Sequence, residues 1–225
     1  MIEPDFLSAT RTSYDAVAGE YTDYVRTELA SKPVDRAQLA AFAELVRASG
    51  AEAGPVADVG CGPGRVTAHL RDLGVEAFGI DLSPQMIAVA RREYPDLRFE
   101  VGTMTDLDLP DAGLGGLVAW YSTIHVPIAE LPAVFAGFHR VLAPGGYLLL
   151  AFQVGDEPLS MTEAFGRSVN LDFHRRRPDV IADLVTDAGL AMQARTTREP
   201  IAGESVRPCP QAFLLARKPP APGAS

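Results

Sequence analysis

The sequence is poor in cysteine and in positive charge. Of its 225 residues only two are cysteine, Cys61 and Cys209, which is too few for the disulfide framework of a small secreted domain. Lys and Arg number 20 against 29 Asp and Glu, so the formal net charge is −9. Broad binding to a phosphate backbone needs clustered basic side chains, and we therefore expect no nucleic-acid partner. The short basic run at 174–177 is interpreted as a solvated loop or helix start.

Long apolar runs and targeting signals are also missing. No apolar run approaches the roughly 20 residues needed to cross a bilayer. The N-terminus carries Glu3 and Asp5, where a signal peptide would have a basic segment followed by an apolar one. We therefore expect a cytoplasmic protein with no membrane partner. No grouping of histidine, cysteine and carboxylate residues has the spacing of a metal site, so no metal is expected, and no pattern indicates an oligomeric state.

The sequence does contain a regular alternation of short apolar runs and helical patterns. Residues 8–50 are expected to be helical, and positions 37–46 carry a dense apolar stripe that is stopped by Gly50. Ser83 and Pro84 supply an N-cap and a first-turn proline for a later helix. The expected strands are 56–59, 76–80, 97–101, 114–121, 147–154, 190–198 and 211–217, and the helices between them are 65–73, 84–93, 128–142 and 178–188.

This alternation predicts an α/β fold with a doubly wound sheet, because parallel strands joined by helices require right-handed crossovers. The last two strands differ: the segment 199–210 between them holds three prolines and a glycine and is too broken for a helix. The last strand is therefore expected to return antiparallel. Residues 155–177 interrupt the alternation and are interpreted as a lid or substrate insertion. The proline-rich segment 219–225 is predicted to be a disordered tail.

The first strand of the alternation runs into a glycine loop. Gly60, Gly62 and Gly64 allow a ligand to approach the backbone, and the helix that follows offers free N–H groups to an anionic group. A dinucleotide-binding fold would require Gly-x-Gly-x-x-Gly, but Arg65 stands where its third glycine belongs. A tight turn that binds no ligand is the structural alternative.

Two acids accompany this loop. Asp58 lies in a strand buried on both faces, where a carboxylate needs donors; it would accept from loop N–H groups or balance a positively charged ligand. Asp81 ends the second strand about twenty residues beyond Gly60, where an acid can accept two hydrogen bonds from a ribose diol. Leu82 and Met86 beside it would form one wall of an adenine slot.

Three segments resemble motifs of the class I, Rossmann-like S-adenosylmethionine-dependent methyltransferases of the small-molecule type. They are Asp58-Val59-Gly60-Cys61-Gly62-Pro63-Gly64, Gly79-Ile80-Asp81-Leu82-Ser83-Pro84-Gln85-Met86 and Leu142-Ala143-Pro144-Gly145-Gly146-Tyr147. The resemblance covers roughly residues 13–218. It implies a seven-stranded sheet with its last strand antiparallel, and S-adenosylmethionine bound within 51–218.

The resemblance also implies the cofactor contacts. The backbone around Gly60 and Gly62 would cradle the methionyl end, and Asp81 would bind the ribose. Thr103 and Met104 would flank adenine, although many relatives carry an aspartate where Thr103 stands. Trp120, the only tryptophan, would wall this pocket or serve the core. The implied cofactor-binding residues are Tyr21, Asp58, Gly60, Cys61, Gly62, Arg65, Asp81, Leu82, Met86, Thr103, Met104 and Trp120.

The N-terminal pattern Tyr14-Asp15-x-Val17-Ala18-x-x-Tyr21 resembles a helix that closes over the cofactor in many small-molecule members. Residues 1–50 are therefore expected to form a helical cap. Its tyrosines would hydrogen-bond the cofactor carboxylate or wall the substrate cavity. The alternative is that Tyr14 and Tyr21, seven apart, line one helix face against the core.

Candidate catalytic residues follow from the rule that open parallel sheets bind ligands beyond the carboxyl ends of their strands. His125 follows the fourth strand, and its imidazole could take a proton from an acceptor or bind its carboxylate. A structural histidine bonded to a nearby carbonyl is the alternative. Tyr14 on the cap and His174 on the lid complete the catalytic candidates. Met161 and Phe165, four apart on the lid, indicate an apolar substrate wall.

These features predict methyl transfer to an O or N atom of a small molecule. In-line displacement at a carbon activated by a sulfonium requires mainly alignment and exclusion of water, and a base only if the acceptor arrives protonated. The alternatives are a nicotinamide-dependent oxidoreductase and a non-catalytic protein that binds S-adenosylmethionine.

Overall fold

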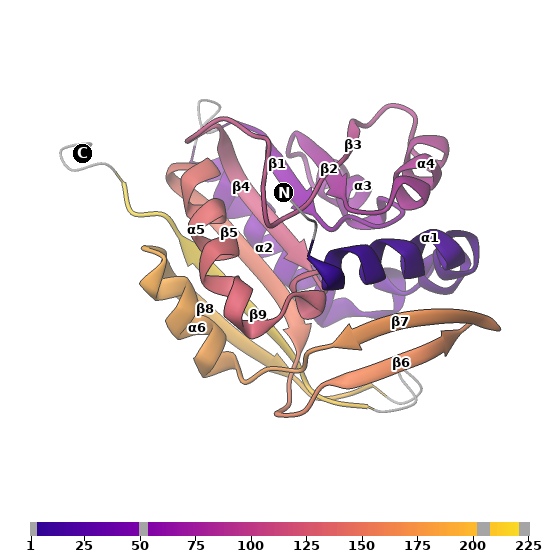
Figure 1. Ribbon diagram of the computed structural model, residues 1–225. Helices are drawn as coiled ribbons and strands as arrows, with labels where there is room; N and C mark the ends of the chain where they lie inside the picture. Colours follow the sequence, from indigo (N-terminus) through magenta and orange to yellow (C-terminus); the bar gives the residue numbers. More distant parts are fainter. Residues whose placement is uncertain (1–3, 50–53, 202–207, 221–225) are drawn as a thin grey trace.

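The computed structural model describes residues 4–49, 54–201 and 208–220. Its centre is a seven-stranded sheet (Figure 1). The strand order is β3 (Phe99–Val101), β2 (Ala77–Asp81), β1 (Val56–Val59), β4 (Leu114–Trp120), β5 (Leu142–Gln153), β9 (Gln211–Arg217), β8 (Ala191–Arg198). β1 pairs in parallel with β2 and β4, and β4 pairs in parallel with β5. β9 is inserted antiparallel between β5 and β8, so the expected antiparallel return of the last strand is confirmed.

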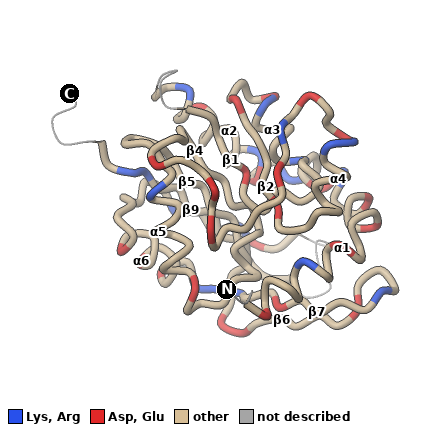
Figure 2. Tube along the Cα trace, turned by 45° about the horizontal axis from the view of Figure 1, so that its top comes forward, with Lys and Arg blue, Asp and Glu red and all other residues tan. Residues whose placement is uncertain are grey.

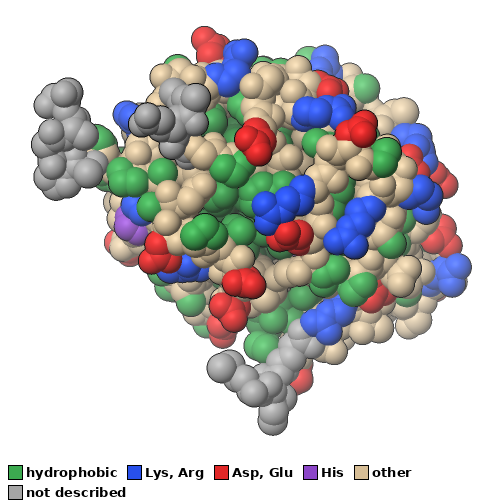
Figure 3. All heavy atoms as spheres, turned by 90° about the horizontal axis from the view of Figure 1, so that it is seen from above, with side chains coloured by type: hydrophobic (Ala, Val, Ile, Leu, Met, Phe, Trp, Pro, Cys, Tyr) green, Lys and Arg blue, Asp and Glu red, His purple; other side chains and the backbone are tan. Residues whose placement is uncertain are grey.

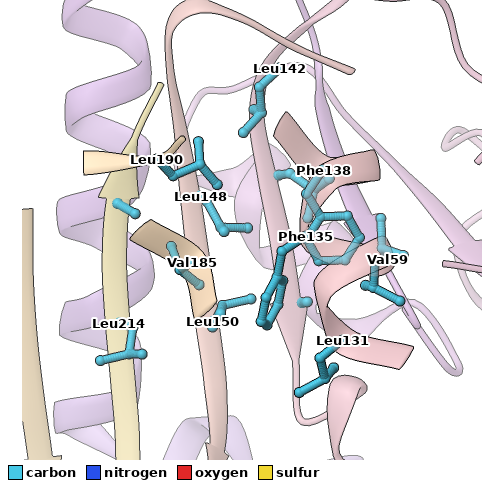
Figure 4. Packing of buried hydrophobic residues seen from close by; sticks show 14 of the residues in the cluster. Val59, Leu131, Phe135, Phe138, Leu142, Leu148, Leu150, Val185, Leu190 and Leu214 are labelled. Carbon is cyan, nitrogen blue, oxygen red and sulfur yellow. The ribbon is translucent and has the colours of Figure 1, made fainter. Parts of the chain in front are cut away.

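Helices cover both faces of this sheet, because successive strand residues point to opposite sides. On one face, Phe135 and Phe138 of α5 (Leu131–Val141) pack over Leu148 and Leu150 of β5, with Val185 of α6 (Pro178–Asp187) beside them, as Figure 4 shows. On the other face, α2 (Pro33–Ala48) and α3 (Arg65–Asp72) pack on the intervening strand residues. That second cluster includes Leu39, Phe42, Val46, Val66, Leu70, Val118, Leu149 and Phe213.

The N-terminal region, which was expected to be helical over 8–50, contains two helices. α1 (Asp5–Val25) is followed by the short turn η1 (Leu29–Ser31), and α2 begins at Pro33. The expected stop at Gly50 lies outside the described residues. α1 crosses the edge of the sheet at which the parallel strands end (Figure 1). No described helix combines the length and the apolar character needed to span a bilayer.

Residues 155–177 contain a hairpin of β6 (Leu159–Ala164) and β7 (Arg167–Phe173), which forms its own two-stranded sheet beside α1 (Figure 1). Val169 and Leu171 pack against Val17 of α1. Phe165 is 46% exposed at the hairpin tip and faces Tyr24, with ring centroids 5.9 Å apart.

Two boundaries differ clearly from expectation. The helix expected over 128–142 is divided into η4 (Ile128–Glu130) and α5. β5 starts at Leu142 rather than at 147, because Leu142 already pairs with Leu114 before the register shifts. α4 (Pro84–Glu93) begins where expected, and the Ser83 hydroxyl caps it by accepting from Met86 N. Most of the expected disordered tail, 221–225, lies outside the described residues.

The charged side chains are intermingled, in agreement with the composition. Figure 2 shows Lys and Arg scattered among Asp and Glu along the chain, and on the face seen in Figure 3 both signs lie side by side. The basic run at 174–177 is an exception to the predicted solvation. Arg177 is exposed, but Arg176 is only 6% exposed, so the solvated interpretation is wrong for Arg176.

Candidate functional site

One cavity lies beyond the carboxyl ends of β1, β2 and β4, beneath α1. Fourteen of the fifteen predicted site residues line it: Tyr14, Tyr21, Asp58, Gly60, Cys61, Gly62, Arg65, Asp81, Leu82, Met86, Thr103, Met104, Trp120 and His125. His174 is not among the lining residues, and its backbone N–H donates to the carbonyl of Ile124 instead. Met161 and Phe165 do not line the cavity either, so the apolar substrate wall expected from them is wrong.

The two glycines at the head of the loop serve different purposes. Gly60 has φ +78°, and a Cβ there would lie 2.2 Å from Cβ of Ser122. The Ser122 side chain therefore leaves room at position 60 for glycine only. Gly62 has φ +54°, and a Cβ added there would meet Cε1 of Tyr21 as its nearest atom, at 4.0 Å. Gly62 is therefore the position at which the backbone faces open cavity.

Asp58 is fully buried and only half satisfied. Its Oδ2 accepts from the Thr67 hydroxyl at 2.7 Å, but its Oδ1 is buried without a hydrogen-bond partner. Its side-chain partner therefore lies on α3, not among the loop N–H groups that we expected it to order. Burial raises the pKa of Asp58 to about 7, while the Thr67 hydrogen bond opposes this shift. A buried carboxylate with a free oxygen favours a cationic neighbour.

The acid that does order the loop is Asp81. Its Oδ2 accepts from Gly62 N at 2.7 Å, and its Oδ1 accepts from Ser83 N at 2.8 Å. Each carboxylate oxygen can accept a second hydrogen bond, so two acceptor positions remain for a diol. Burial raises the pKa of Asp81 to about 6, against the effect of these two backbone donors.

The helix α1 is bound to the start of α4 by Asp15, a residue that was not among the predicted site residues. Asp15 Oδ1 accepts from the Ser83 hydroxyl at 2.5 Å and from Gln85 N at 3.1 Å, so it binds the first turn of α4. Asp15 stands inside the Tyr14–Tyr21 pattern, which was the available signal. Farther along, Arg65 Nη2 lies 2.6 Å from Oε2 of Glu28, which joins the glycine loop to the segment after α1.

Thr103 and Trp120 both line the cavity, but they have different contacts elsewhere. The Thr103 hydroxyl lies 2.9 Å from that of Thr105 and accepts from Thr105 N, so it stabilises its own turn. Trp120 is 6% exposed and packs on Phe213 with ring centroids 5.4 Å apart, while it also lines the cavity. The core and wall interpretations of Trp120 therefore both apply.

His125 and Tyr14 form a hydrogen-bonded pair at the cavity wall. His125 lies in η3 (Thr123–His125) after β4, and its Nδ1 is 2.9 Å from the carbonyl oxygen of Asp172. A carbonyl only accepts, so Nδ1 carries the proton and Nε2 has a free lone pair. Tyr14 Oη lies 2.8 Å from that Nε2 and donates to it.

The environment keeps this histidine neutral. Burial lowers the pKa of His125 to about 4, and the Asp172 carbonyl opposes the shift only in part. Burial likewise raises the pKa of Tyr14 well above its ordinary value. At neutral pH the pair is therefore an uncharged phenol and an uncharged imidazole. Within the described residues, no group of three or more His, Cys, Asp or Glu is arranged to hold a metal ion.

Comparisons with known proteins point to one family. Residues 56–146 match a family model described as a methyltransferase domain. A demethylmenaquinone methyltransferase of Chlorobaculum parvum is 30% identical over 149 residues, covering 65% of this chain and 60% of that protein. A malonyl-[acyl-carrier protein] O-methyltransferase of Serratia marcescens is 32% identical over 94 residues, 42% of this chain and 36% of that protein. The chain thus spans less than two thirds of these relatives.

Solved structures share the fold at lower identity. An S-adenosylmethionine-dependent methyltransferase of Methanosarcina mazei has a TM-score of 0.68 at 18% identity and covers 78% of this chain and 97% of its own. Magnesium protoporphyrin IX methyltransferase of Synechocystis, solved with bound S-adenosylmethionine, has a TM-score of 0.67 at 16% identity and covers 97% of this chain and 99% of its own. Residues 56–146 of this chain thus match a methyltransferase domain model, and the chain has the fold of these S-adenosylmethionine-dependent methyltransferases.

S-adenosylmethionine is bound in the Synechocystis structure, and two features of the cavity in this chain fit that molecule. The unpartnered Asp58 Oδ1 suits the cationic end of the amino-acid part. The open space in front of Gly62 lets a ligand lie against the backbone. Both features belong to the methyltransferase domain of residues 56–146.

The cavity has a further side that the sequence did not predict. Phe6, Leu7, Thr10 and Arg11 of α1 line it, and Val126 lines it from the loop after η3. The apolar spacing of α1 was visible in the sequence, but the face that it turns to the cavity depends on how α1 docks. Thr10 and Arg11 lie one turn before Tyr14 in α1, and Val126 follows His125, so these residues flank the Tyr14–His125 pair.

Proposed function

We propose that this chain transfers a methyl group from S-adenosylmethionine to an O or N atom of a small molecule. The observation that carries the proposal is that the Asp58–Gly62–Asp81 cradle and the Tyr14–His125 pair line the same cavity. The names of the two relatives, which refer to demethylmenaquinone and to malonyl-acyl-carrier protein, support a small or carrier-bound acceptor.

The cofactor would be held by residues of the domain 51–218. Asp58 Oδ1 would accept from its ammonium group, Gly62 would lie against its methionyl end, and Asp81 would accept from its ribose hydroxyls. The adenine would lie between Leu82, Met86, Thr103 and Met104. Tyr21, Gly60, Cys61, Arg65 and Trp120 complete the proposed cofactor contacts.

When bound, the cofactor supplies a methyl carbon made electrophilic by the sulfonium, so the protein's task is alignment. We assign that task to Tyr14. Because its hydroxyl proton is donated to His125 Nε2, the lone pairs of Tyr14 Oη remain to accept from the O–H or N–H of an acceptor. His125 holds Tyr14 in this orientation. With a pKa of about 4, it is a weak base at neutral pH.

The charge of the cavity disfavours a cationic acceptor. Among the described lining residues, the carboxylates are Asp58 and Asp81, and both lie on the cofactor side. The acceptor side is apolar apart from Thr10, Arg11 and the tyrosine–histidine pair. An ammonium group would find no carboxylate there, whereas a hydroxyl or a neutral amine on an apolar body would fit.

Access to the cavity would be controlled by the segments that cover it. We assign residues 1–50 as a helical cap and 155–177 as a lid. The cap is held by two residues of α1. Asp15 accepts from the Ser83 hydroxyl at the start of α4, and the Ser13 hydroxyl accepts from Asn170 N of β7 at 2.8 Å. Exclusion of water by these segments would prevent hydrolysis and strengthen polar contacts inside.

The test combines binding with product formation. Calorimetry with S-adenosylmethionine, S-adenosylhomocysteine and NADH should show binding of the first two only. The protein is then incubated with S-adenosylmethionine and a panel of phenols, alcohols, amines and carboxylic acids, and S-adenosylhomocysteine is measured. Product with a hydroxyl or neutral amine acceptor supports the proposal. Tight NADH binding without S-adenosylmethionine binding refutes it, and cofactor binding without any product supports a non-catalytic binding protein.

A further inference from the structure

The segment after β7 sends one arginine into the interior. Arg176 is 6% exposed, whereas its neighbour Arg177 has a side chain that is 60% exposed and pairs with Asp179 at 2.6 Å. Burial lowers the pKa of Arg176 to about 10, so the guanidinium stays charged at neutral pH. The backbone is anchored as well, because Arg176 N donates to the Gln153 carbonyl at the end of β5, at 2.9 Å.

The guanidinium of Arg176 binds the loop that carries His125. Its Nη1 donates to the carbonyl of Thr123 at 3.1 Å, and its Nη2 donates to the carbonyl of Val126. These two carbonyls lie on either side of His125 in the chain. Between them, the carbonyl of Ile124 accepts from His174 N at 2.8 Å. The segment after β7 therefore binds the backbone both before and after His125.

The position of this loop controls the geometry of the histidine ring. The ring's Nδ1 must reach the Asp172 carbonyl of β7, and its edge packs on Phe173 with centroids 4.9 Å apart. A shift of the loop relative to β7 would lengthen the hydrogen bond from His125 Nδ1 to the Asp172 carbonyl. The Nδ1–H tautomer would then no longer be favoured over the Nε2–H tautomer, and in the latter Nε2 cannot accept from Tyr14. Arg176 itself is not among the cavity-lining residues, so it makes no ligand contact there.

We propose that Arg176 is a positioning residue for the methyl transfer: it fixes the 123–126 loop and thereby the His125–Tyr14 pair. A guanidinium is suited to this task because its planar fork spans two carbonyls, which the single ammonium of lysine does less well. The role rests on the proposed function in so far as Tyr14 aligns the acceptor. The positioning of His125 itself can be measured without any acceptor.

The experiment compares Arg176→Gln and Arg176→Lys with Arg177→Gln, a control that removes the exposed neighbouring charge. Nitrogen-15 NMR of the histidine side chains at neutral pH, with and without S-adenosylhomocysteine, reports the His125 tautomer. Wild type and Arg177→Gln should show a single Nδ1–H form. Arg176→Gln should show a mixture of tautomers, and Arg176→Lys a smaller change. With an acceptor identified as above, kcat should fall by about 10- to 100-fold in Arg176→Gln, with S-adenosylhomocysteine affinity retained.

The outcomes separate this inference from the proposed function. An Arg176→Gln protein that folds and keeps the wild-type His125 spectrum overturns the inference, whatever the acceptor panel shows. If Arg176→Gln does not fold, Arg176→Lys decides: a spectrum equal to that of Arg177→Gln overturns the inference, and a mixture of tautomers supports it. A mixture of tautomers without methyl transfer to any acceptor would support the positioning role and count against the proposed function.

Discussion

Replacement of Asp58 by asparagine should stabilise the free protein and weaken cofactor binding, and both effects depend on pH. The side chain is fully buried, Oδ1 has no hydrogen-bond partner, and burial raises its pKa from 3.8 to about 7. Between these two pH values the folded state binds a proton that the unfolded state has lost. The free energy of unfolding of the wild type therefore decreases as pH rises through this window.

The magnitude follows from the size of the shift. About three pKa units at about 1.4 kcal/mol each set an upper limit of about 4 kcal/mol at pH 8. Asparagine removes this cost but places an amide N–H₂ or carbonyl at the unpartnered position, which costs about 1–3 kcal/mol. We expect a net gain of about 1–3 kcal/mol above pH 7, with each kcal/mol raising Tm by roughly 2–4 °C. Near pH 5 only about 1.2 pKa units of this shift apply, about 1.6 kcal/mol, so the cost of the unpartnered amide cancels the gain.

The assay is thermal unfolding of wild type and Asp58→Asn from pH 5 to pH 9, with S-adenosylhomocysteine calorimetry over the same range. Asp81 titrates in both proteins, so the difference between the two curves isolates Asp58. Affinity should fall by about 1.5–3 kcal/mol in the variant at pH 8, the worth of a hydrogen bond to a charged group. Below pH 7, wild-type affinity should weaken more steeply than the variant's affinity, because Asp81 titrates in both proteins but Asp58 titrates only in the wild type. A variant that is less stable at pH 8, or that binds as tightly as wild type, refutes the reasoning.

Three further predictions concern separate parts of the molecule. Asp81→Ala should weaken S-adenosylhomocysteine binding by about 1–3 kcal/mol in calorimetry, because Gly62 N and Ser83 N lose their acceptor; unchanged affinity would disprove the ribose assignment. His125→Ala should lower kcat by about 10- to 100-fold while S-adenosylhomocysteine affinity is kept, and an unchanged kcat would remove the pair from the mechanism. Gly137→Ala in α5 should stabilise the protein by about 1 kcal/mol in thermal unfolding, because no atom lies within 4 Å of the added Cβ, and a lower Tm would contradict this.

The parts of the site that were predictable are those encoded over short stretches of chain. The segment from Asp58 to Arg65 joins β1 directly to α3. Ser83 caps α4 by accepting from the backbone N–H of Met86, only three residues farther along the chain. Such signals depend only on local backbone geometry, so most strands and helices of the main sheet could be predicted to within two residues, with β5 and the helix before it as exceptions. The same holds for Asp81, which simply ends β2.

The parts that could not be predicted depend on contacts between distant segments. Asp15 reaches Ser83 across 68 positions, and the Ser13 hydroxyl reaches Asn170 across 157. No periodicity within α1 indicates these partners, so the cavity-facing side of the cap was missed. The hairpin was misjudged for a related reason. Met161 and Phe165 share a spacing that describes a helix, whereas β6 ends at Ala164 and Phe165 lies in the turn.

The structure also changes what His125 can do. Both ring nitrogens already have partners, the Asp172 carbonyl at Nδ1 and the Tyr14 hydroxyl at Nε2. Direct proton abstraction from an acceptor would first require the Tyr14 hydrogen bond to break, and the resulting imidazolium would be buried beside the charged Arg176. Tyr14 is therefore the group that an acceptor meets. Since its phenol is kept neutral by burial, the pair is better suited to orient an acceptor than to ionise it, and acceptors that are already nucleophilic at neutral pH should be methylated fastest.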